Sequence, residues 1–201
     1  MSTHANIRLV RESDSNALLE IYGPFVTHTT VSFEYELPTE DEFRGRIRSY
    51  SEKYPWLVCE LDGKVVGYAY ASKHRDRTAY QWSVEVSVYV HPEYHKKHIA
   101  KALYTALFEI LELQGFISAY AGVAIPNEKS RGFHVSFGFK PIGIYHKVGY
   151  KLGKWLDTEW FERDIATAYA EPNNPKYIHE IRETEAFNRV LKSASGLIKR
   201  D

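Results

Sequence analysis

The chain has 201 residues, of which 44% are hydrophobic, and it carries 26 basic and 26 acidic side chains. This is enough apolar material for the core of one domain. The balanced charge lacks the basic footprint of a nucleic-acid-binding protein. No segment approaches the run of about eighteen apolar residues that a membrane span needs. We therefore expect no nucleic-acid partner and no membrane association.

The start of the chain and its cysteine usage indicate a compartment. Residues 1–6 are polar and differ from the charged and apolar regions of a signal peptide. The single cysteine, Cys59, cannot form an internal disulfide and lies in an apolar run, which is typical of a buried residue in a reducing environment. We expect a cytoplasmic protein.

The first quarter of the chain reads as one strand, two helices and an extended segment. Pro24 is expected to end or kink the first helix, and a capping box at residues 39–42 starts the second. In chain order the predicted elements are a strand over 7–11, a helix over 17–25, an extended segment over 30–36, and a helix with Phe43, Ile47 and Tyr50 on one face.

From residue 56 the apolar period becomes that of strands. Asp62-Gly63 is a hairpin turn, and Gly115 is a helix stop. The predicted elements are strands over 56–61, 65–71 and 82–90, a helix from Ile99 to Leu111, a strand over 116–125, a short helix over 128–137, and a last antiparallel pair over 142–148 and 155–165. This order favours a mixed α/β (α+β) fold.

The composition shifts near residue 168. We predict a domain over residues 1–168 and, over 169–201, a linker followed by an amphipathic helical extension. Residues 170–175 are the linker. The apolar residues that suggest the helix are Ile178, Ile181, Phe187, Val190, Leu191 and Leu197. This helix is expected to dock on its own domain or across a two-fold dimer.

Several segments resemble a known family. Residues 86–103 resemble the strand, loop and helix that bind acetyl-CoA across the GNAT superfamily, and residues 127–139 resemble its later helix with a Gly-Phe end. Within the superfamily the chain resembles the phosphinothricin acetyltransferases over residues 7–164. The segments that carry this are 21–26, 30–33, 54–58, 79–82 and 149–155. The resemblance implies a mixed, mostly antiparallel sheet with splayed central strands, flanked by helices.

The resemblance also implies an activity and its residues. The chain would be an acetyl-CoA-dependent N-acetyltransferase for a small amino-acid-like substrate, without a metal, and a homodimer like related enzymes. Glu85 would be the general base and His134 would contact substrate and handle protons. The implied cofactor-binding residues are Val88, Tyr89, Val90, His95, Lys96, Lys97, His98, Ile99, Ala100, Lys101 and Asn127. The implied substrate-binding residues are Phe33, Arg75, Arg77 and Tyr80.

One residue departs from the family pattern. His98 stands where the phosphate loop usually has glycine, a residue that lets the backbone approach a pyrophosphate closely.

Other interpretations stay open from the sequence. Glu85 could belong to a solvated face or a salt bridge, His134 could simply be packed on its helix, and the lysines could be ordinary surface residues. His91, His95 and His98 superficially resemble a metal triad, although Pro92 and the neighbouring lysines oppose it. A non-catalytic acyl-CoA-binding module and a GNAT enzyme for a different amine are the remaining alternatives. Phosphinothricin, methionine sulfoximine or sulfone, arsenic-containing analogues and ordinary amino acids all share an α-amine and a carboxylate.

Overall fold

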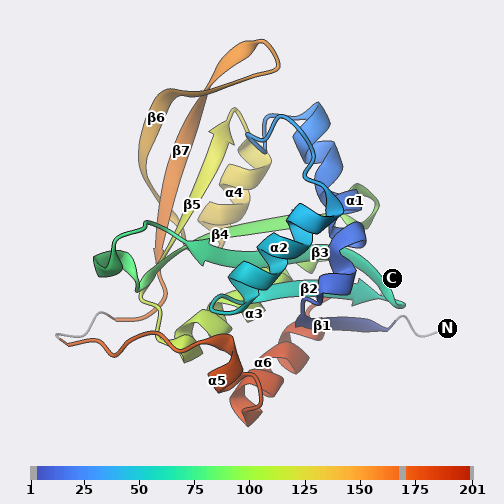
Figure 1. Cartoon of the computed structure of the whole chain (residues 1–201), viewed down its shortest axis with the longest axis vertical. Helices are drawn as coiled ribbons and strands as arrows, with labels where there is room; N and C mark the ends of the chain where they lie inside the picture. Colours follow the sequence, from blue (N-terminus) through green and yellow to red (C-terminus); the bar gives the residue numbers. More distant parts are fainter. Residues whose placement is uncertain (1–3, 168–170, 200–201) are drawn as a thin grey trace.

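The computed structural model describes residues 4–167 and 171–199. Its centre is a seven-stranded sheet with the order β1-β2-β3-β4-β5-β7-β6 (Figure 1). Neighbouring strands are antiparallel except β4 and β5, which are parallel. The strands are β1 Ala5–Leu9, β2 Trp56–Leu61, β3 Lys64–Lys73, β4 Ser83–Val90, β5 Ser118–Ile125, β6 Lys140–Lys151 and β7 Lys154–Asp164. This confirms the mixed, mostly antiparallel sheet.

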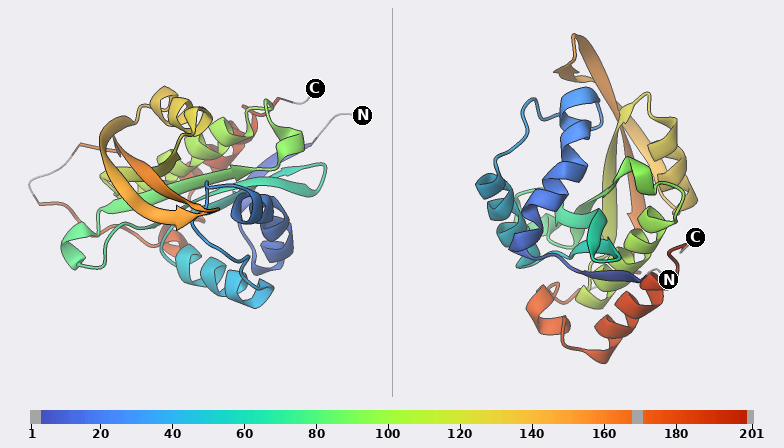
Figure 2. Two further views of the ribbon diagram at one scale, coloured as in Figure 1. Left: turned by 90° about the horizontal axis from the view of Figure 1, so that it is seen from above. Right: turned by 90° about the vertical axis from the view of Figure 1, so that its right-hand side faces the viewer.

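Helices cover both faces of the sheet. The α-helices are α1 Ser15–His28, α2 Glu40–Ser51, α3 Ile99–Gln114, α4 Glu128–Ser136, α5 Ile178–Ile181 and α6 Glu185–Ser195; short 3₁₀ turns are η1 Glu12–Asp14, η2 Thr78–Tyr80 and η3 Pro92–Tyr94. Figure 2 shows α1 and α2 on one face and α3, α4 and α6 on the other. Each face therefore has its own apolar cluster.

The turn and cap chemistry explains where several elements begin. Asp62 and Gly63 both have positive φ, as a two-residue hairpin between β2 and β3 requires. Thr39 caps α2, and Glu42 closes the predicted capping box. α3 ends at Gly115, whose left-handed backbone conformation suits glycine. Cys59 is buried in β2, and burial raises the pKa of its thiol to about 12.

The structure differs from one prediction about the first quarter of the chain, and it excludes one of two alternatives for the first helix, namely that it ends at Pro24. Residues 30–36 form bends and loop rather than an extended strand. Their backbone is instead held at Ser32, whose carbonyl accepts from Nζ of the buried Lys151 (2.6 Å). The same ammonium donates to the carbonyl of Val26 in α1 (2.7 Å). α1 also continues past Pro24 to His28, where hydroxyls of Thr27 and Thr29 bond carbonyls of its last turns.

The C-terminal segment packs against the rest of the molecule. It contains two helices rather than one, and α6 lies against α3 and β1 (Figure 1). Phe187 is only 2% exposed, and Ile178, Ile181, Val190 and Ala194 are buried in the cluster that includes α3. Leu197 is 39% exposed. Of the apolar positions expected in the tail, Leu191 is partly buried and Leu197 is exposed, while Ile198 after it is buried in the same cluster.

Backbone and side-chain hydrogen bonds fasten the same segment. The Ser195 hydroxyl accepts from the Ile7 amide in β1 (2.9 Å). The Lys199 amide donates to the carbonyl of Lys97 (3.0 Å), in the loop before α3. Within residues 4–167 and 171–199, no helix is long and apolar enough to cross a membrane.

Candidate active site

The parallel strands β4 and β5 separate after a short shared stretch. They pair only over residues 83–85 of β4 and 118–120 of β5, and then diverge (Figure 1). In the described part of the chain no strand pairs beyond Glu85 with the edge of β4 that faces β5. Backbone amide and carbonyl groups on this edge therefore face the gap between the strands. A cavity of about 600 Å³, called here the β4–β5 cleft, lies at this point. Such an open edge can receive an extended ligand as an added strand.

The N-terminus of α3 closes one end of the β4–β5 cleft. The first intrahelical bond is donated by Ala102 to His98, so the amides of residues 99–101 are left for another acceptor. His98 precedes the helix with φ 60° and Lys96 has φ 67°, a left-handed backbone that usually favours glycine. Lys96 and Lys101 line the cleft and add positive charge. The arrangement suits an anionic group at the helix end.

The cofactor residues expected from the sequence gather here. All of them except Lys97 line the β4–β5 cleft, His98 and Asn127 included. The carbonyl of Lys97 instead accepts from Lys199. The Asn127 side-chain oxygen caps α4 by accepting from Ser130 N (3.1 Å), which leaves its amide NH₂ to donate elsewhere.

A second cavity, of about 350 Å³, adjoins the β4–β5 cleft. We call it the Glu85 cavity; it is lined by Phe33, Tyr70, Ser72, Glu85, Tyr145 and Trp160, among others. The two cavities share Val31, Val86, Ser87 and Gly122 as lining residues. A carboxylate therefore stands beside the open edge of β4.

Glu85 has a partner that the sequence did not indicate. Its Oε1 lies 3.0 Å from Nδ1 of His74, the residue that directly follows β3. No local pattern marks His74, because the contact depends on how β3 pairs with β4. Ser72 and Glu85 are register partners, which brings the end of β3 over Glu85.

His134 lies on α4 and lines the β4–β5 cleft. Its Nδ1 donates to the carbonyl of Ser130 (2.8 Å), since a carbonyl can only accept. Nε2 then accepts, and the Tyr104 hydroxyl lies 3.3 Å from it as donor. Burial lowers the pKa of His134, although the Ser130 contact partly opposes this, so the ring is held neutral.

This burial predicts a pH-dependent stability. The unfolded chain protonates His134 near its ordinary pKa of 6.5, whereas the folded chain resists protonation. Stability is therefore complete above pH 6.5 and is lost as the pH falls, by at most about 1.4 kcal/mol per pH unit. Urea unfolding at pH 7.5 and 5.5 should show a smaller loss for His134→Gln than for the wild type. Equal losses would contradict the assignment.

The predicted substrate-binding residues do not all line the same cavity. Phe33 lines the Glu85 cavity, and its ring lies against Gly149, where an added Cβ would come within 2.4 Å of it. Tyr80 lies beside His74, with ring centroids 6.1 Å apart. Arg75 and Arg77 are exposed on the loop between β3 and β4 and line neither cavity. Their contact with a substrate stays a prediction.

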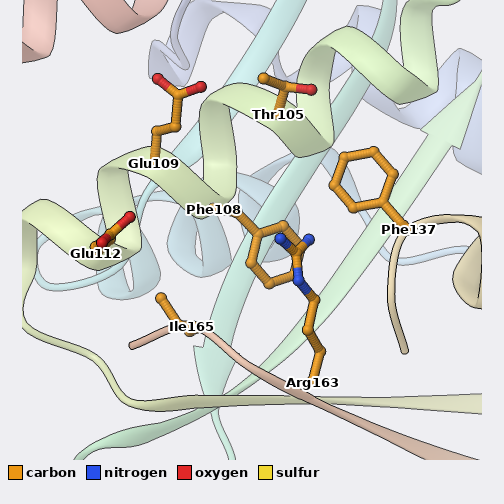
Figure 3. Close-up of a pocket in the computed structure, with 7 residues that line it drawn as sticks. All are labelled: Thr105, Phe108, Glu109, Glu112, Phe137, Arg163 and Ile165. Carbon is orange, nitrogen blue, oxygen red and sulfur yellow. The ribbon is translucent and has the colours of Figure 1, made fainter. Parts of the chain in front are cut away.

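A separate cavity of about 220 Å³ lies between α3 and β7 (Figure 3). Arg163 lays its guanidinium over the Phe108 ring, 4.0 Å from the centroid, and 5.1 Å from that of Phe137. Phe137 ends α4, so this stacking ties the helix that carries His134 to the sheet. In the described ranges, no group of three or more His, Cys, Asp or Glu side chains could hold a metal ion.

Comparison with known proteins agrees with this geometry. Residues 7–160 match the family model of an acetyltransferase (GNAT) domain. The chain is 35% identical over 159 residues to phosphinothricin N-acetyltransferase of Streptomyces viridochromogenes, covering 79% of this chain and 87% of that protein. It is 32% identical over 163 residues to an L-methionine sulfoximine/L-methionine sulfone acetyltransferase of Salmonella typhimurium, covering 79% of this chain and 94% of that protein.

A solved structure with the same architecture is that of a phosphinothricin acetyltransferase from Sinorhizobium meliloti in complex with acetyl-CoA. It has a TM-score of 0.80 and 34% identity, over 84% of this chain and 93% of that one. The splayed strands, the family match over most of the chain and these relatives agree: the chain belongs to the GNAT acetyltransferase family.

Proposed function

We propose that this acetyltransferase moves the acetyl group of acetyl-CoA to the α-amine of a small amino-acid-like acceptor. The observation that carries the proposal is the pair of adjoining cavities, one along the open β4 edge and the other at Glu85. The printed names of the relatives, which specify phosphinothricin and methionine sulfoximine or sulfone, support this class of acceptor.

The β4–β5 cleft fits acetyl-CoA, which supplies a reactive acetyl thioester. The open β4 edge can bond the amides of its pantetheine arm, and the first-turn amides of α3 can bind its pyrophosphate. Lys96 and Lys101 complement the phosphate charge, and the amide NH₂ of Asn127 can donate to the arm. The donors in the cleft thus match the acceptors of the cosubstrate.

Glu85 is assigned the first proton transfer. An ammonium acceptor in the Glu85 cavity gives a proton to the carboxylate, which frees the nitrogen lone pair. The nitrogen then forms a bond to the acetyl carbon, the carbon–sulfur bond breaks, and its electron pair stays on sulfur. Backbone amides near Tyr89 on the β4 edge donate to the carbonyl oxygen as its negative charge grows.

The second amine proton must reach the sulfur. We assign this transfer to Tyr104 and His134, because both line the β4–β5 cleft and their side chains are joined. Burial raises the pKa of Tyr104 far above its ordinary value, so its hydroxyl stays protonated and donates a hydrogen bond to His134 Nε2. The second amine proton passes from the nitrogen to the thiolate through this pair, and both side chains end in the protonation states in which they began.

An acetyl-transfer screen tests the proposal. Purified protein is incubated with acetyl-CoA and phosphinothricin, methionine sulfoximine, methionine sulfone or ordinary amino acids, while thiol release and the acetylated product are followed. We expect stoichiometric thiol and N-acetyl product with at least one amino-acid-like acceptor. Binding of acetyl-CoA without thiol release for any amine would favour the non-catalytic acyl-CoA-binding alternative.

His98→Gly should tighten acetyl-CoA binding by roughly threefold to tenfold. Glycine adopts the left-handed conformation at this position freely, and it removes a side chain from the β4–β5 cleft where the pyrophosphate is expected. Calorimetric titration measures the change. Lys147→Gly, at another left-handed residue in the hairpin, is the matched control. Weaker binding by His98→Gly would instead identify the imidazole as a phosphate ligand.

We also infer that the chain acts as a homodimer through the β6–β7 hairpin. This hairpin projects from the body of the molecule (Figure 1). Trp155 is 62% exposed, and Ile142, Ile144, Val148 and Tyr150 are also exposed. An apolar surface of this kind is typical of an interface between copies. Light scattering should give twice the monomer mass for the wild type and the monomer mass for Trp155→Lys; a monomeric wild type would refute the inference.

A further inference from the structure

We infer that His74 is a positioning residue for Glu85, and that its imidazole fixes the carboxylate for proton transfer. The inference rests on the proposed function, in which Glu85 accepts a proton from the acceptor amine. Its geometric basis is the 3.0 Å separation of His74 Nδ1 and Glu85 Oε1. Because an ionised carboxylate can only accept, Nδ1 carries the proton in this bond. Oε1 therefore accepts the hydrogen bond from His74, and Oε2 is the oxygen left to take the proton from the acceptor amine.

The imidazole is held in place by its neighbours. Its ring stacks on Tyr120 of β5, with centroids 4.3 Å apart and planes 14° from parallel. Tyr80 and Trp160 meet the ring edge-on from η2 and β7. Its side chain is 12% exposed. A ring packed on these sides cannot follow a rotating carboxylate, so the hydrogen bond selects one orientation of Glu85.

The contact between His74 and Glu85 lies where β4 and β5 separate. Glu85 and Tyr120 are the last residues at which β4 and β5 pair before the strands separate. His74 bridges these two residues, bonding one and stacking on the other. The imidazole therefore fixes the base at the point where the open β4 edge begins.

The groups that face the His74 ring come from four elements. They are Glu85 from β4, Tyr80 from η2, Tyr120 from β5 and the uncharged Trp160 from β7. In the adjoining loop Arg75 and Arg77 are exposed, and Asp76 pairs with Lys73 (3.3 Å). Of these groups, the Glu85 carboxylate is the hydrogen-bond acceptor of His74 Nδ1.

Two substitutions separate positioning from packing. His74→Phe keeps an aromatic ring on Tyr120 but removes the donor, whereas His74→Asn places an amide NH₂ near the position of Nδ1 and cannot titrate. A hydrogen bond to a charged group corresponds to a factor of about 10 to 100. We expect His74→Phe to lower kcat by that factor with an unchanged KM for acetyl-CoA, and His74→Asn to recover most of the turnover.

A matched pair elsewhere in the chain provides the control. His146 Nδ1 lies 2.9 Å from Asp157 Oδ2 in the β6–β7 hairpin, and its side chain is 73% exposed. His146→Phe and His146→Asn should leave kcat and the pH profile of the wild type unchanged. In a Glu85→Gln background, His74→Phe should cause no further loss, because the two residues act through one another. Circular dichroism and melting curves identify variants that fail to fold, and the turnover of His74→Asn relative to His74→Phe then decides the matter.

The outcomes are distinguishable from those of the proposed function. If the wild type transfers acetyl groups to no amine, the proposed function fails before His74 is considered. If the wild type is active and His74→Phe matches it in kcat and pH profile, the positioning role is refuted. The role is also refuted if His74→Asn loses as much turnover as His74→Phe.

Discussion

Glu85→Gln should lower kcat for acetyl transfer by about a hundredfold or more, while the free energy of unfolding changes by less than about 1 kcal/mol. The two side chains are nearly isosteric, and the amide oxygen can still accept from His74. The amide has no useful basicity at neutral pH, so the ammonium acceptor would have to lose its proton to water. Steady-state kinetics at saturating acetyl-CoA measure the loss.

The pH profile and a control strengthen this test. At high pH more of the acceptor amine is free, so the deficit of Glu85→Gln should shrink as the pH rises. Glu109→Gln, an exposed carboxylate on α3 outside both cavities, should behave like the wild type. Near-normal turnover by Glu85→Gln across the pH range would remove Glu85 from the mechanism.

Phe187→Ala should reduce the free energy of unfolding by about 3 to 5 kcal/mol, the usual cost of truncating a fully buried phenylalanine. Phe187 is 2% exposed in the cluster that α6 forms with α3 and β1. Leu197→Ala is the matched control in the same segment, because Leu197 is 39% exposed and should cost far less. Urea unfolding of both variants gives the comparison.

Deletion of residues 172–201 extends the same prediction. It would uncover the apolar surfaces of α3 and β1 that α5 and α6 now cover, and we expect a large fall in melting temperature. An unchanged melting temperature would contradict a structural role for the segment.

The sequence predicted best what is built from neighbouring residues. The β4 strand, the loop after it and α3 follow one another without interruption, so their apolar periods and turn residues predict these elements, and the family resemblance assigns the expected cofactor residues to them. Likewise the hairpin at Asp62-Gly63 depends only on local backbone preferences. Local backbone preferences of this kind agree with the tertiary structure, so the sequence alone predicts them.

The contacts that the sequence could not supply are those between distant elements. His74 meets Glu85 only through the pairing of β3 with β4, and Tyr104 meets His134 only because α3 packs against α4. Residues 30–36 have β-branched and aromatic residues typical of a strand, yet they form a loop in which the Lys151 ammonium holds the carbonyl of Ser32. A long-range hydrogen bond there overrides a local preference.

The sequence identified His98 as a departure from the family pattern, and the structure shows the backbone conformation of this residue. The backbone at this position is left-handed even without glycine, and Lys96 is left-handed as well. His98 is the residue directly before α3, whereas the residues that precede α2 and α6 have an extended backbone. The glycine that the family usually has at this position adopts a left-handed backbone readily. The structure shows that histidine adopts it here as well.

The bond from the Lys199 amide to the Lys97 carbonyl has a practical consequence for handling the protein. An affinity tag fused after residue 201 would start within a few residues of the loop before α3. A hexahistidine tail there could pull on that loop or offer its own cations to a nucleotide, and affinities measured with it would report the tag as well as the protein. Tags for quantitative work belong at the other terminus, or should be cleaved before titration.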